Sequence, residues 1–166
     1  KEAAISAPSV IAKISNHKDL FRSEKDYQNF IKEIIIKNPE AYCELDQKSK
    51  ANKEIALTLI NTNQGSNCFD LIPKNLIREN GFIEDAIKLN GEFFSFLLKS
   101  KYPLTTKHLE IAVASDSSVI RSVPFDVLRD ENLQISLIKT SINAKKELEK
   151  RGLKLSGKVL AAYSAM

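Results

Sequence analysis

The sequence has little glycine, proline, cysteine or tryptophan, and each shortage excludes a class of structure. Its 166 residues include 5 Gly, 5 Pro, 2 Cys and no Trp. An all-β sandwich or barrel would need more glycine in its turns, and a small secreted scaffold would need more cysteine for disulfides. The longest apolar runs, such as Ile34–Ile36 and Phe93–Leu98, are far too short to span a bilayer. These shortages favour a domain built from helices with short connections.

The two cysteines, Cys43 and Cys68, can form at most one internal disulfide. Unpaired cysteine is commonly a small buried apolar residue. We therefore expect two free thiols and a reducing compartment, the cytoplasm.

Charge is distributed unevenly along the chain. The net charge is +4, yet residues Lys139–Met166 contain 7 Lys and Arg against 2 Glu, and the remainder contains 18 against 19 acids. The basic character therefore belongs to the C-terminal segment and does not indicate a nucleic-acid-binding surface over the whole chain. With 43% hydrophobic and 28% charged residues, the composition is typical of amphipathic helices with solvated outer faces.

Five segments begin alike at intervals of 24 to 28 residues, with starts at Glu24, Asn52, Asn80, Thr106 and Asp130. In each segment the third and seventh residues after the start are apolar, and residues four apart share one face of a helix. Asn, Asp and Thr are also favoured as N-caps. The pattern predicts a series of short amphipathic helices.

A breaker segment and a second apolar block follow each of these predicted helices. Two of the blocks end alike, in Leu71-Ile72-Pro73 and Ser122-Val123-Pro124, and proline is tolerated in the first turn of a helix but not later. We therefore predict a second short helix and a stub after the proline. The fold class is all-α, with stacked helix pairs of about 24–28 residues forming a solenoid or a compact helical bundle. An irregular bundle with coincidental similarities is the alternative.

The stubs Leu76-Ile77-Arg78-Glu79 and Val127-Leu128-Arg129-Asp130 share a further ending. With the helix starts, they resemble a family of tandem short α-helical repeats of unknown function. Bacterial proteins, including those of intracellular pathogens, and protist proteins contain such repeats. The units from Glu24 and Asn80 lack the Leu-Arg-acid ending. The resemblance implies an interaction scaffold and brings no known catalytic residues.

We predict three regions: an N-terminal helical flank (1–23), a repeat domain (24–141, with units near 24, 52, 80 and 106 and a partial unit at 130) and a basic C-terminal helical cap (142–166). Helices are expected near 25–37, 53–62, 82–90, 107–114 and 131–150, with Gly152 as a C-cap and a further apolar helical turn at Ser9–Ile14. The equivalent positions Leu59, Ile87, Val113 and Leu137 should be buried.

Few residues in the sequence could support catalysis. The only histidines are His17 and His108, and a nucleophilic pair of Cys68 with His108 would lie in no recognisable signature. The spacing of histidine and cysteine matches no metal site. Gly152–Lys158 has the glycine and lysine spacing of a phosphate loop, but Val159 replaces the hydroxyl residue that would hold magnesium. We therefore expect no enzyme activity, metal or cofactor.

Six basic residues are the candidates for contact with a partner: Arg78, Arg129, Lys145, Lys146, Lys150 and Arg151. The two arginines each end a stub beside an acid, where a local salt bridge or a helix C-cap is an equal alternative. The four others belong to a basic amphipathic segment that could contact an anionic partner or only cap the last repeat. A membrane surface could be contacted only through this segment, and the absence of Trp disfavours nucleic-acid binding.

The sequence thus favours a non-catalytic helical-repeat module that binds another protein. The alternative is a regulatory or targeting domain of a larger protein, such as a translocated bacterial effector, with its activity elsewhere. The location would then be the host cytosol. Because the first residue is Lys1 rather than methionine, we expect the chain to be part of a longer protein.

Overall fold

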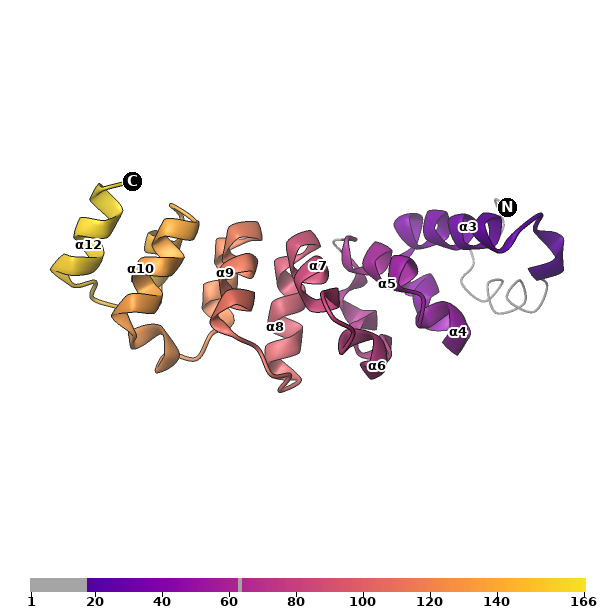
Figure 1. Ribbon diagram of the computed structural model, residues 1–166, viewed down its shortest axis with the longest axis horizontal. Coiled ribbons are helices and arrows are strands. Elements are labelled where there is room, and N and C mark those ends of the chain that lie inside the picture. Colours follow the sequence, from indigo (N-terminus) through magenta and orange to yellow (C-terminus); the bar gives the residue numbers. More distant parts are fainter. Residues whose placement is uncertain (1–17, 63) are drawn as a thin grey trace. The chain divides into compact units, whose positions relative to one another are not determined.

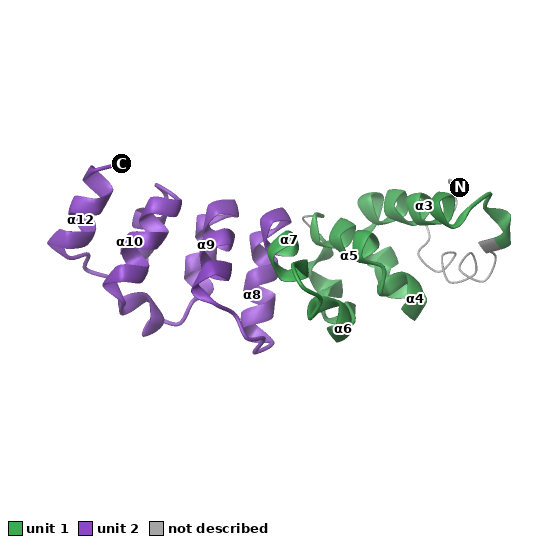
Figure 2. Cartoon of the chain, viewed as in Figure 1, with its two compact units in different colours: residues 1–86 green, residues 87–166 purple. Residues whose placement is uncertain are grey.

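The computed structural model describes residues 18–62 and 64–166, and every regular element within them is helical (Figure 1). The predicted all-α class is therefore confirmed. The chain divides into two compact units, residues 1–86 and 87–166 (Figure 2), and each is considered by itself. The helix predicted at Ser9–Ile14, most of the predicted flank and His17 lie outside the described residues.

The first unit contains short α-helices and 3-10 helices, the latter labelled η. In chain order they are η1 (Lys18–Leu20), α3 (Glu24–Lys37), η2 (Pro39–Glu44), α4 (Gln47–Lys50), α5 (Lys53–Ile60), η3 (Gly65–Leu71) and α6 (Lys74–Ile77). Helix α7 (Phe82–Leu89) follows, and the division between the units falls within it. Helix α3 packs against both α5 and η2, and η2 packs against η3.

Local sequence explains the bounds of α3. The Ser23 side chain accepts a hydrogen bond from the backbone N–H of Asp26 and so caps the first turn. The helix ends at Asn38, which precedes a proline. Apart from the exposed Ile36, its apolar side chains lie on one face and are buried: Tyr27, Phe30, Ile31, Ile34 and Ile35. Their burial against α5 and η2 provides much of the core of the first unit.

A disulfide joins Cys43 of η2 to Cys68 of η3, and the two Cα atoms are 6.2 Å apart, within the usual range for a disulfide. The expectation of two free thiols is therefore wrong. The packing of η2 on η3 brings together residues 25 positions apart, which a count of cysteines could not reveal. The predicted reducing compartment depended on free thiols, so it loses that support and stays an untested prediction.

The second unit also consists of short α-helices and 3-10 helices. After α7 come α8 (Gly91–Lys99), α9 (Thr106–Ser115), η4 (Ser117–Ser122), η5 (Val127–Arg129), α10 (Glu131–Thr140), α11 (Ala144–Lys150) and α12 (Gly157–Ser164). Helix α9 packs against α8, η4 and α10, and α10 also packs against α11, α12 and η5. The buried apolar residues of this unit thus come from elements that are near neighbours in the chain.

Four of the five predicted helices occur at the expected places, as α3, α5, α7 and α9. The fifth prediction, a single helix over 131–150, is wrong because the chain turns between α10 and α11. Ser141 is extended there, with φ −148° and ψ 125°, and its carbonyl accepts a hydrogen bond from Ala144 N–H at 2.9 Å. The expected core positions are confirmed, since at most 1% of each is exposed: Leu59, Ile87, Val113 and Leu137.

Helices α8 and α11 end in the same hydrogen-bonded motif. After α11, Gly152 has a φ of +81°, and the N–H groups of Gly152 and Leu153 donate to the carbonyls of Glu149 and Leu148. The predicted C-cap at Gly152 is thus confirmed as part of a Schellman motif. After α8, Lys101 occupies the equivalent left-handed position with a φ of +57°. This position is unfavourable for a residue with a Cβ.

Candidate functional site

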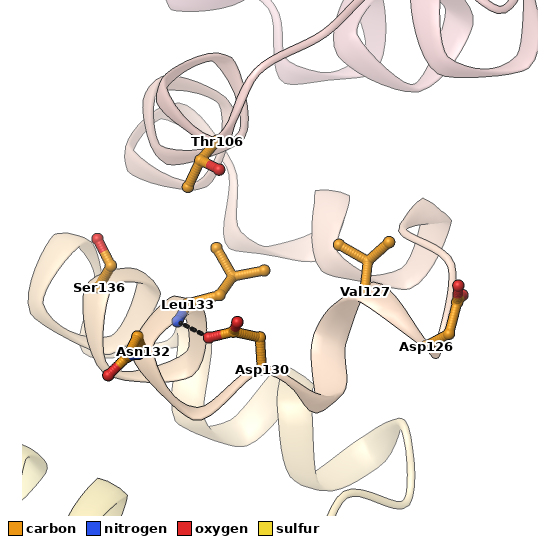
Figure 3. A pocket seen from close by; sticks show the side chains of 7 residues that line it. All are labelled: Thr106, Asp126, Val127, Asp130, Asn132, Leu133 and Ser136. Atoms are coloured by element: carbon orange, nitrogen blue, oxygen red, sulfur yellow. Dashed lines mark hydrogen bonds between the residues drawn. The ribbon is translucent and has the colours of Figure 1, made fainter.

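A surface hollow of about 580 Å³ lies within the second unit (Figure 3). Its lining comes from the start of α9, the η5 turn and the first two turns of α10, and consists of Thr106, Asp126, Val127, Asp130, Asn132, Leu133 and Ser136. The Leu133 side chain projects between Thr106 and Val127. The hollow therefore has an apolar centre with polar groups around it, as many binding sites do.

The N-cap of α10 sets the geometry of this hollow. Asp130 Oδ1 accepts the backbone N–H of Leu133 at 2.9 Å, which holds one carboxylate oxygen at the helix start. Asp126 precedes η5 without such a capping bond and is exposed. Ser136 donates a hydrogen bond to Glu110. Of the two carboxylates in the lining, Asp126 is therefore the one free of a capping bond.

Exposed apolar side chains lie in and beside the hollow. Val127, in the lining, is 44% exposed, and Phe125, two residues earlier, is 37% exposed. Arg129, one of the predicted partner-contacting residues, places its guanidinium carbon 5.1 Å from the centre of the Phe125 ring. A partner that bound here would remove this apolar surface from water.

A second hollow, of about 540 Å³, lies in the first unit and is lined by Leu20, Phe21, Arg22, Asp26, Asn29, Phe30 and Glu33. The Phe21 ring packs against Tyr27 and Phe30, with centroids 5.3 and 5.2 Å apart. Leu20, which contributes to the lining, follows closely on residues that lie outside the described part of the chain. We therefore treat the hollow of the second unit as the candidate site.

The structure places most of the predicted basic residues in contacts within the chain. Lys145 pairs with Glu149 at 3.5 Å and lies 4.8 Å from the centre of the Tyr163 ring. Lys150 Nζ donates to Glu147 at 2.6 Å. Four of the six candidates are exposed, namely Arg78, Arg129, Lys146 and Lys150, and Arg78 is the C-cap residue of α6.

Arg151 forms a further internal contact. Its Nη2 donates to the Val123 carbonyl at 2.9 Å, and its buried Nε has no hydrogen-bond partner among the described residues. Lys145 and Arg151 thus contact other elements of the second unit, whereas Lys150 contacts its own helix. This arrangement favours a capping role for the segment over a free basic surface.

Sequence alone did not identify the buried ionic contact that centres on Glu147. This carboxylate is 6% exposed, and it accepts hydrogen bonds from Arg121 at 2.8 and 3.2 Å as well as from Lys150. These bonds lower the pKa of Glu147 to about 2, although its burial opposes the shift. The carboxylate thus ties α11 to η4.

The groups considered for catalysis have structural roles. Cys68 is bonded to Cys43, and His108 forms a capping box in which its side chain accepts from Thr105 N–H at 3.0 Å. In residues 18–62 and 64–166, no group of three or more acidic, histidine or cysteine side chains could hold a metal ion. The two glycines with phosphate-loop spacing also lie at helix ends. Gly152 follows the C-terminus of α11, and Gly157 is the first residue of α12.

No helix in the described part of the chain combines the length and apolar character needed to cross a membrane. The chain matches no protein-family model, no curated protein and no solved structure.

Proposed function

We propose that this chain is a non-catalytic helical-repeat module that binds another protein through the hollow of its second unit. The observation on which this depends is the exposed apolar surface of Phe125 and Val127 at a polar-rimmed hollow. Soluble domains seldom leave such surface clustered beside a hollow without a binding role.

Contacts between elements about one unit apart support the repeat arrangement. Lys32 pairs with Glu54 and Lys53 with Asp85, each at 2.8 Å. In the second unit Ser95 contacts Ser122 at 2.9 Å, and Ser136 contacts Glu110. Stacked helix pairs form contacts of this kind between successive units, and their surface residues can vary without disturbing the core.

The roles of the cysteines and of His108 support a non-catalytic function. A hydrolase of the cysteine type needs a free thiolate beside a base, whereas Cys68 is in a disulfide and His108 caps a helix. The disulfide and the capping box stabilise local structure, so a catalytic role is not needed to explain Cys68 or His108.

Selection of peptides tests this function. A display library of random peptides of about twelve residues, long enough to occupy a groove, is selected on the immobilised chain, and enriched peptides are measured by isothermal titration. We expect saturable one-to-one binding that Val127→Asp weakens without changing the thermal melt. If no enriched peptide binds in solution, the proposal is wrong.

A further inference from the structure

The segments Cys68–Glu79 and Val119–Asp130 allow the two units to be compared position by position. Apart from positions 70, 71 and 74 and their counterparts 121, 122 and 125, residues 51 positions apart in these segments are similar in type. Four such pairs are buried in both units, with at most 4% exposure: Cys68 and Val119, Phe69 and Ile120, Ile72 and Val123, Ile77 and Leu128. The register between the segments is therefore the same in structure as in sequence.

One pair in this register differs sharply. Leu76 in α6 is 1% exposed, whereas Val127 in η5 is 44% exposed. The apolar side chain at this position is thus buried in the first unit and open at the hollow in the second. Because the neighbouring pairs keep the same burial, the difference is local to this position. Val127 is thus an apolar residue that stays exposed at a position that is buried in the first unit.

The residues just before this position differ in charge as well. Lys74 and Asn75 of the first unit correspond to Phe125 and Asp126 of the second. The second unit therefore lacks a cation and has an additional anion and an aromatic ring at the same place. The two differences make the local charge more negative, whereas residues 87–166 as a whole carry a net positive charge, with 13 Lys and Arg against 8 Asp and Glu. The lining of the hollow is thus acidic within a basic unit, while the Arg129 guanidinium lies beside it against Phe125.

We propose that the hollow binds a short segment of the partner protein in which a lysine or arginine adjoins an apolar residue, an inference that rests on the protein-binding function above. The apolar side chain covers Val127 and Leu133, and the cation lies against Asp126. The lining contains two carboxylates and, among the described residues, no Lys or Arg. Nucleic acid and anionic lipid would be repelled by the same carboxylates.

The test exchanges the two units' residues at this place. The double variant Phe125→Lys/Asp126→Asn gives these two positions the residues found at positions 74 and 75 of the first unit. Both positions are exposed, so the fold should be retained. We expect peptides selected on the unaltered chain to contain Lys or Arg beside an apolar residue. Their affinity should fall at least about tenfold in the double variant, and it should fall with added salt.

The reciprocal variant Lys74→Phe/Asn75→Asp is the matched control. It creates the same local charge beside Leu76, which is already buried, so it should add no second binding site. Enriched peptides without cations, or binding that the first double variant leaves unchanged, would overturn the inference while leaving protein binding intact. Self-association of the chain that Phe125→Lys/Asp126→Asn abolishes would show that a second copy occupies the hollow, and would also overturn it.

Discussion

Glu147 shows how single residues fix the C-terminal part of the second unit. Its buried carboxylate lies between Arg121 of η4 and Lys150 of its own helix, with nitrogen–oxygen distances of 2.8 and 2.6 Å. A buried carboxylate that lost these partners would be costly to desolvate. Lys150 therefore stabilises the fold through Glu147.

The low pKa of Glu147 predicts a stability that depends on pH. The folded pKa is about 2 and an unfolded Glu titrates near about 4.3, so the stabilisation is present above about pH 4.3 and is lost as the pH falls towards 2. Glu147→Gln should lower the free energy of unfolding by about 1–3 kcal/mol at pH 7, and the difference should shrink below pH 4. Urea melts at several pH values measure it.

Glu149→Gln is the control for this experiment, since Glu149 is 49% exposed and contacts Lys145 at 3.5 Å. Exposed ion pairs contribute little, so this variant should unfold like the parent at every pH. Equal effects of the two substitutions would contradict the role assigned to Glu147.

The disulfide gives a second prediction at this scale. Cys43 and Cys68 close a loop with a sequence separation of 25, for which chain-entropy estimates give about 3.5 kcal/mol. Protein folded in air should show no reactive thiol after denaturation without reductant, and dithiothreitol should lower its urea midpoint. Two reactive thiols in the oxidised protein would contradict the pairing. The double variant Cys43→Ser/Cys68→Ser should be insensitive to dithiothreitol.

At the scale of elements, the sequence predicted helix starts better than helix types. The caps at Asn52, Thr105 and Asp130 each accept a backbone N–H near the predicted start. The second elements η2, η3 and η4 form 3-10 helices, which short apolar blocks do not distinguish from α-helices. The turn at Ser141 was missed because Lys139–Arg151 is rich in residues that favour helix.

The C-terminus of α8 predicts a stabilising substitution. Lys101 has a φ of +57°, and a side chain in this conformation costs about 1–2 kcal/mol relative to glycine. Lys101→Gly should therefore raise the free energy of unfolding by about 1 kcal/mol after the entropy of glycine is subtracted. Differential scanning calorimetry should show a higher melting temperature. Lys99→Gly, within α8, should instead lower it by a similar amount, and a lower melting temperature for Lys101→Gly would refute the cap.

At the scale of the whole molecule, the charge asymmetry and the apolar pattern were visible in the sequence, but the candidate site was not. Leu76 and Val127 occupy matching sequence patterns, and only the packing around each shows that one is covered and the other open. A pattern of apolar positions reports which residues can be buried, whereas the neighbour that buries them depends on tertiary structure. The hollow could therefore be identified only from the structure.

The division of the chain at residue 86 predicts where a core substitution will act. Leu59→Ala and Leu137→Ala each remove a fully buried side chain and should cost about 2–4 kcal/mol. Because each short helix packs on its neighbours in the chain, the loosening should stay within one unit. In hydrogen exchange measured by mass spectrometry, Leu59→Ala should speed exchange in α3 and α5, and Leu137→Ala in α9 to α12. A uniform rise along the chain in either variant would show that the two units unfold as one.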